Sequence, residues 1–294
     1  MNTSKLFIFL LVISFVFVIV KITKNPDRSN SYNEKLVDFD SQVVDKIEIK
    51  TENEQVVLKK IAGQWKVKVD QKQHEAVEST VETFLQTIQT IKPSRIASRS
   101  VERWSDYDVD DRGTRVVISG KNDVFLDIIL GRFAFEGQRT YYNFVRLGDE
   151  NDTYVADNFM KMSLITQRDD FRNNSVLNFK NDSLTSINFI YPDSAFSLIK
   201  KQNNWFTNNV EVDSSQFKNY FDDVKFVMNK SFAPLDSVSV ATHEIVFSFS
   251  NRSDIKITAG LDNGEWLIRS SENKGEAWKD PDLSKKILVS NKDF

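Results

Sequence analysis

The residues best suited to acid–base or metal chemistry are few in this sequence. It has two histidines, His74 and His243, and no cysteine. A Ser-His-Asp triad would need one of them, but His74 lies in the polar stretch "QKQHEA" and His243 opens a predicted strand beside Glu244, both typical of surface or strand-edge positions. Two histidines without cysteine cannot form a three-histidine or cysteine-containing zinc site, and no H-E-x-x-H is present. We therefore predict no catalytic residues.

A dense acidic run, "WSDYDVDDRG" at residues 104–113, comes closest to a cation site. Its carboxylates are Asp106, Asp108, Asp110 and Asp111. The first three have the 1-3-5 spacing of a calcium loop, which also needs Gly at position 6 and Glu at position 12. Asp111 and Val117 occupy those two positions instead. We interpret the run as a solvated loop and predict no metal centre; an opportunistic cation site is the alternative.

Nucleotides and nucleic acids are excluded as ligands by two features. The 9 glycines are scattered and form neither G-x-x-x-x-G-K-[ST] nor G-x-G-x-x-G, so no glycine loop can hold phosphates. The net charge of −3 gives no electrostatic basis for binding nucleic acid. Glycosidase carboxylates would need a specific separation across a cleft, and 42 acidic residues do not single out such a pair. We expect no cofactor.

The N-terminus, "KLFIFLLVISFVFVIVKITK" from Lys5 to Lys24, differs from the rest of the chain. As a helix its apolar part covers roughly 25 Å, close to the ~30 Å of a bilayer core, and the flanking lysines can reach the headgroups. The sequence predicts a transmembrane anchor at residues 1–24 and a polar tether at 25–42. A cleaved signal peptide is the alternative, although no A-x-A-like site follows the apolar stretch.

The flanking charges leave the orientation of this anchor open. Lys5 and the amino terminus lie on one side, and Lys21, Lys24 and Arg28 lie on the other. Long domains are translocated largely regardless of such charges. We expect a single-pass protein of the inner membrane with its globular body on the periplasmic side.

An internal repeat organises the remaining chain. Residues 44–65 align with 184–205, and Trp65 falls on Trp205. Each copy shows two alternating strands separated by polar turns and a third strand that opens at the tryptophan, because apolar residues recur at period 2. A helical pattern follows Asp70 in the first copy and Asp213, a predicted N-cap, in the second. The predicted buried faces of these helices are Val77, Val81, Phe84 and Leu85, and Tyr220, Val224, Val227 and Met228.

A strand-rich segment and a short closing helix complete each copy. "RVVISGKNDVFLDIILG" corresponds to "EIVFSFSNRSDIKITAG", and Asp157 and Asp280 are predicted N-caps of the closing helices. The predicted fold class is α+β, a tandem duplication of an antiparallel-sheet-plus-helix unit preceded by one N-terminal transmembrane helix. The predicted repeats are residues 43–165 and 184–294, joined by a linker at 166–183.

The two tryptophans have two interpretations. Matching positions in a duplicated framework favour apolar anchors in the core, where the third strand meets the helix. Stacking on a glycan is the alternative.

The chain resembles the bacterial domain of unknown function 4340 family over about residues 44 to 230. The resemblance rests on the strand–turn–strand–turn–Trp opening, the helix, "LGR" at 130–132, "TYYNFV" and "QRDDFRNNSVLNF" at 167–179. The chain departs from the family's "YGL" at residues 106–109. The resemblance implies a membrane-anchored envelope protein, often encoded beside ABC-transporter and gliding-type auxiliary components, and it carries over no catalytic residues.

We therefore expect a non-enzymatic, membrane-anchored envelope accessory protein that binds partner proteins. The expected partners are the membrane itself, through the single helix, and membrane proteins such as an ABC-type permease or auxiliary subunit. A ligand- or glycan-binding module that uses aromatic residues is the second interpretation, and an unrecognised hydrolase is the third.

Overall fold

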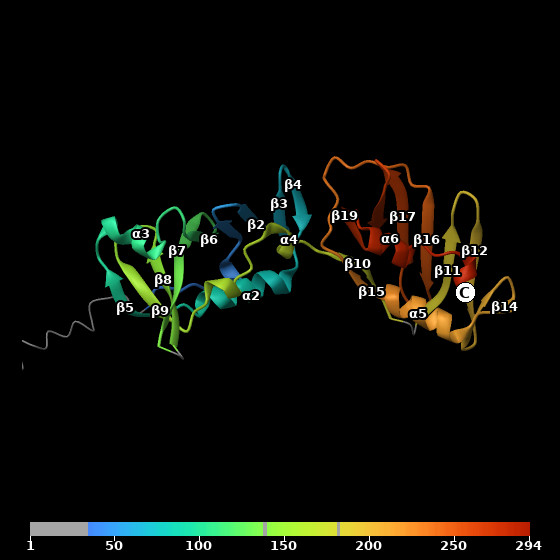
Figure 1. Cartoon of the computed structure of the whole chain (residues 1–294), viewed down its shortest axis with the longest axis horizontal. Coiled ribbons are helices and arrows are strands. Elements are labelled where there is room, and N and C mark those ends of the chain that lie inside the picture. The colour runs from blue at the N-terminus through green and yellow to red at the C-terminus, as the bar shows by residue number, and fades with distance from the viewer. Residues whose placement is uncertain (1–34, 138–139, 181–182) are drawn as a thin grey trace, which may run out of the picture. The chain divides into compact units, whose positions relative to one another are not determined.

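The structure is a computed structural model that describes residues 35–137, 140–180 and 183–294. In this part of the chain nineteen strands outnumber five α-helices (Figure 1). The α-helices are α2 (Glu78–Gln89), α3 (Trp104–Tyr107), α4 (Arg168–Phe171), α5 (Ser214–Val224) and α6 (Pro281–Ile287). Short 3₁₀ turns lie at Ser41–Val43, Val101–Arg103, Lys161–Ser163 and Asn291–Asp293.

The predicted α+β class is wrong, because the described chain consists mostly of antiparallel β-sheet. Several segments predicted as helix or linker form strands or turns instead. Val227 and Met228, predicted to extend the second helix, lie in strand β15 because α5 ends at Val224. After Asp157 the chain forms only the 3₁₀ turn at Lys161–Ser163, so its predicted role as an N-cap is also wrong. Asp157 instead ends strand β9 and lies 3.8 Å from Arg95.

The predicted membrane helix needs correction as well. No helix in residues 35–137, 140–180 and 183–294 is long and apolar enough to cross a membrane. The longest of them, α2, has 12 residues and one buried face. The segment predicted to span the membrane, residues 1–24, lies outside the described residues. The structure therefore does not support the single N-terminal membrane helix, and it does not show the predicted membrane-protein partners.

The chain divides into two compact units. The first contains the described residues up to Gln55 together with Glu82–Ile165, and the second contains Val56–Val81 together with Thr166–Phe294. This division differs from the sequence repeats, since residues 56–81 of the first repeat belong to the second unit. The segment 166–183, predicted as a linker, contributes α4 and strand β10 to the second unit.

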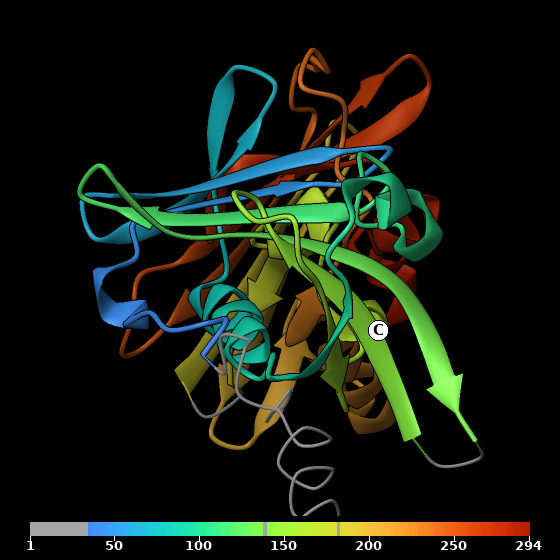
Figure 2. The same ribbon diagram turned by 90° about the vertical axis from the view of Figure 1, so that its left-hand side faces the viewer.

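The larger sheet has nine strands in the order β4-β3-β2-β1-β6-β7-β8-β9-β5. The strands are β1 (Lys46–Lys50), β2 (Gln55–Ile61), β3 (Gln64–Val69), β4 (Lys72–Glu75), β5 (Pro93–Ser98), β6 (Thr114–Gly120), β7 (Asp123–Glu136), β8 (Thr140–Leu147) and β9 (Thr153–Asp157). A register shift between Leu130 and Phe133 interrupts the β7–β8 pairing. Such bulges bend a strand, and the outer half of this hairpin curves away from its inner half (Figure 2).

The second sheet has eight strands in the order β14-β13-β12-β11-β16-β17-β18-β19. They are β11 (Leu184–Ile190), β12 (Ala195–Lys201), β13 (Asn204–Thr207), β14 (Val210–Glu211), β16 (His243–Phe249), β17 (Ile255–Asp262), β18 (Glu265–Ser270) and β19 (Asn273–Trp278). A separate pair joins β10 (Ser175–Asn178) to β15 (Phe226–Met228). In the larger sheet the eight neighbouring strands that run from β4 to β9 in the sheet order have the same connectivity as the eight of the second sheet. The ninth strand, β5, is added at the edge beside β9.

The core of the second unit lies between its sheet and α5. Phe217, Tyr220 and Phe221 of α5 are buried with inward-facing residues of β11, β12 and β16. Trp205 stacks on Phe217 with ring centroids 4.3 Å apart and is 7% exposed, and Trp65 is 4% exposed. The prediction that both tryptophans are buried is therefore confirmed.

Two of the predicted helix caps are also confirmed. The Asp213 carboxylate accepts hydrogen bonds from the backbone N–H groups of Ser215 and Gln216 at the start of α5. The Asp280 carboxylate accepts from Asp282 and Leu283 at the start of α6. Each carboxylate satisfies donors that have no partner within the helix.

Candidate functional sites

The acidic run is held by neighbouring arginines. Asp106 pairs with Arg103 at 3.0 Å, and Arg112 lies 3.0 Å from Asp110 and 3.4 Å from Asp108. The hydrogen bonds from Arg112 lower the pKa of the Asp110 carboxyl. No group of three or more possible metal-ligating side chains occurs in the described part of the chain.

Calcium is therefore expected to leave the stability of residues 40–294 unchanged. A cation would have to displace Arg103 and Arg112 from the carboxylates that they now contact. Differential scanning fluorimetry with calcium and then with a chelator measures the effect. A calcium-dependent rise of several degrees that disappears in Asp108→Ala would establish a metal site.

His243 lies among aromatic rings at the start of β16. Its Nδ1 is 2.9 Å from the hydroxyl of Thr242, and its ring lies 4.6 Å from Tyr191 and 4.7 Å from Trp266, measured between centroids. Burial lowers the pKa of the His243 imidazole. His243 is the first residue of β16, which pairs with β11 on one side and β17 on the other, so its place is the start of a central strand rather than a strand edge.

His74 is buried, which differs from the predicted surface position. It lies on β4, and its Nδ1 is 2.8 Å from Oε1 of Glu276 on β19. Arg172, which follows α4, donates its Nε to the same oxygen at 3.3 Å and its Nη2 to Oε2 of Glu276. The three residues are at most 5% exposed and all belong to the second unit.

The surrounding backbone holds this buried cluster, His74, Arg172 and Glu276, in place. Ala76, two residues after His74, forms an antiparallel bridge with Arg172, and the N–H of Asn173 donates to the carbonyl of Glu75 at 2.8 Å. The Arg172 guanidinium also contacts Asp169 at 2.9 Å and lies 3.6 Å from the centroid of the Phe232 ring. No sequence pattern indicates the cluster, because 202 residues separate His74 from Glu276.

The proton positions in the buried cluster follow from its contacts. Both oxygens of Glu276 accept hydrogen bonds from the Arg172 guanidinium, which can only donate. His74 therefore carries its proton on Nδ1. In the neutral imidazole the other nitrogen, Nε2, is then an acceptor, and it has no hydrogen-bond partner among the described residues.

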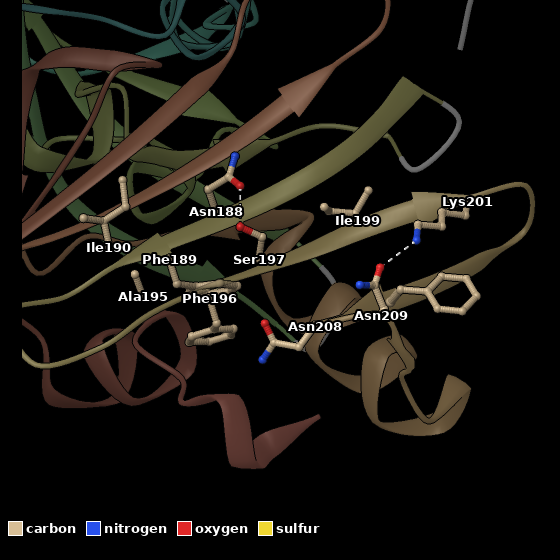
Figure 3. Close-up of a pocket in the computed structure, with 11 residues that line it drawn as sticks. Asn188, Phe189, Ile190, Ala195, Phe196, Ser197, Ile199, Lys201, Asn208 and Asn209 are labelled. Atoms are coloured by element: carbon tan, nitrogen blue, oxygen red, sulfur yellow. Dashed lines mark hydrogen bonds between the residues drawn. The ribbon is translucent and has the colours of Figure 1, made fainter.

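A second candidate site is a hollow of about 550 Å³ on the outer face of β11, β12 and β13 (Figure 3). We call it the outer groove. Ile190 and Ile199 project from it and are 50% and 46% exposed. Asn188 accepts a hydrogen bond from Ser197 at 2.8 Å across the two strands. Its remaining lining residues are Phe189, Ala195, Phe196, Lys201, Phe206, Asn208 and Asn209.

The first repeat carries lysines at three of the apolar positions of the outer groove, whereas Ile61 takes the place of Lys201. Its strands β1 and β2 end at the residues equivalent to the ends of β11 and β12, and the pair Lys59–Lys66 corresponds to Ile199–Phe206. Lys50 likewise corresponds to Ile190. At these three positions the same strand framework thus carries lysines in the first repeat and apolar side chains, exposed or half-buried, in the second.

These features define a mostly antiparallel β protein with a duplicated sheet connectivity, one exposed apolar groove and one buried polar cluster. The sequence model of the family described as Domain of unknown function (DUF4340) matches residues 74–245, more than half of the chain. The chain therefore belongs to this family, which confirms the resemblance seen in the sequence. No curated protein and no solved structure matches it.

Proposed function

We propose that this chain is a non-enzymatic binding protein that docks a partner protein in the outer groove. The observation that carries the proposal is the apolar-for-lysine difference between equivalent positions of the two repeats. Exposed aliphatic side chains on a sheet face weaken solubility unless something covers them. The first repeat shows that this framework tolerates lysine at the same positions, so folding alone does not require Ile199 and Phe206 to be apolar.

The groove's chemistry suits a protein partner better than a glycan. Glycan sites rely on flat aromatic faces that are open to solvent, whereas the Phe206 ring is half-buried with the Lys201 ammonium 5.2 Å from its centroid. Ile190 and Ile199 offer aliphatic contact area, and the amides of Asn188, Asn208 and Asn209 offer donors and acceptors at the rim. An apolar centre with a polar rim is typical of protein interfaces.

The groove also favours binding over catalysis. Lys201 is the one titratable side chain among its lining residues, and its Nζ donates to Asn209 at 3.1 Å. A general acid or base would need a carboxylate or imidazole at this surface. The periplasmic location expected from the sequence stays a prediction.

The test places the lysines of the first repeat at the equivalent positions of the outer groove. A photo-crosslinking amino acid at Ala195, inside the groove, should give discrete adducts with a protein in the native cell. The double variant Ile199→Lys and Phe206→Lys should reduce the adduct yield at least about tenfold, because each buried charge costs on the order of a kcal/mol or more.

The matched control adds the same two charges elsewhere in the same unit. Val238→Lys and Val240→Lys replace side chains that are 75% and 83% exposed and lie outside the groove, so the adduct should persist. A crosslinker at Ser215 on α5 should not give the same adduct. Equal yields in both double variants, or adducts that contain only glycan, would exclude the proposed interface.

A further inference from the structure

A small cationic cavity adjoins the buried cluster. It measures about 170 Å³ and is formed by residues of β4, β18 and β19, by Arg172, and by the segment 233–237, all within the second unit. Its basic side chains are Lys72, Arg172, Arg269 and Lys274, and its only carboxylate is Glu276. We call it the basic cavity.

Most of this positive charge has no carboxylate partner. Arg172 and Glu276 form a pair, but neither Lys72 nor Lys274 has an ion pair within the described ranges. Arg269 contacts neutral groups, the carbonyl of Ser237 at 3.3 Å and the hydroxyl of Ser239 at 3.4 Å. The nearby Asp262 is held by Lys279 at 2.9 Å. The cavity therefore favours an anion.

His74 adds a requirement that charge alone does not impose. The buried cluster determines the tautomer of His74, because its Nδ1–H group donates to Oε1 of Glu276. In the neutral imidazole this leaves Nε2 of a buried, cavity-lining histidine as an acceptor without a partner in the described chain. A buried acceptor without a partner costs about 1–3 kcal/mol. A ligand that satisfies it must offer a hydrogen-bond donor.

We propose that the basic cavity binds inorganic phosphate as hydrogen phosphate. Its anionic oxygens meet the lysine and arginine donors, and its P–O–H group donates to Nε2 of His74. Sulfate has the same shape and charge but no proton to donate in mildly alkaline solution. A water occupies about 30 Å³ of liquid, so the cavity has room for an ion of five heavy atoms. This site is independent of the outer groove.

Isothermal titration calorimetry of the full chain against sodium phosphate and sodium sulfate, at matched ionic strength and mildly alkaline pH, tests the proposal. Phosphate should bind at least about tenfold more tightly than sulfate, because only phosphate satisfies the histidine acceptor. His74→Gln should remove most of this preference, with its melting curve recorded to verify folding.

A second variant does not alter the buried cluster. Lys72 and Lys274 are exposed, so Lys72→Gln with Lys274→Gln should leave folding intact and weaken phosphate binding at least about tenfold. Lys285→Gln with Lys286→Gln removes two exposed charges from α6 of the same unit and should change nothing. Absence of phosphate binding, equal affinity for the two ions, or phosphate affinity unchanged in the Lys72 and Lys274 variant would each overturn the proposal.

Discussion

Replacing Trp205 by alanine is expected to lower the free energy of unfolding of the second unit by about 3–5 kcal/mol. The indole is almost fully buried and stacks on Phe217, so its removal leaves a cavity at the junction of β13 and α5. Trp65→Ala should have an effect of similar size, because its side chain is equally buried. Urea unfolding followed by circular dichroism measures both changes.

Val210→Ala provides the control for this experiment. Val210 lies on β14, the strand that pairs directly with β13, and it is 66% exposed. Its truncation should change the free energy of unfolding by no more than about 0.5 kcal/mol. An unchanged unfolding curve for Trp205→Ala, accompanied by loss of glycan binding, would show that the tryptophan acts at a surface.

Local patterns in the sequence predicted those parts of the fold that depend on neighbouring residues. Trp205 follows two alternating strands and a polar turn, so its burial could be read from periodicity. Asp213 precedes an amphipathic stretch, and its side chain needs only the next three residues to form a cap. Both features are determined within one or two elements.

Other features depend on residues that are far apart or on a choice that periodicity leaves open. His74 lies on β4 of the larger sheet and Glu276 on β19 of the second sheet, and each looks like an ordinary polar strand residue in sequence. Phe189 and Ile190 are adjacent apolar residues, so alternation alone could not say which one faces solvent. The structure leaves Ile190 50% exposed at the outer groove, whereas Phe189, which also lines the groove, is 1% exposed and belongs to the core. The structure contains more strand than the sequence predicted for the same reason. Segments such as β15 and β5 form strands by pairing with β10 and β9, which are far away in the sequence.

The largest electrostatic effect is expected from Glu276→Ala, which should cost about 3–5 kcal/mol of the free energy of unfolding. The change leaves the Arg172 guanidinium buried without its main carboxylate and removes the acceptor of His74 Nδ1. Asp169, which contacts Arg172 at 2.9 Å, is itself 45% exposed and can compensate only in part.

A double-mutant cycle separates the cost of an unpaired charge from the value of the pair. Arg172→Met with Glu276→Ala removes both charges and should be less destabilised than Glu276→Ala alone, because no buried ion then lacks a partner. Glu272→Ala breaks the partly exposed pair with Arg252 at a neighbouring position and should cost at most about 1 kcal/mol. If Glu276→Ala proved no more harmful than Glu272→Ala, the cluster would be accessible to water. The histidine acceptor on which phosphate recognition depends would then be satisfied by solvent.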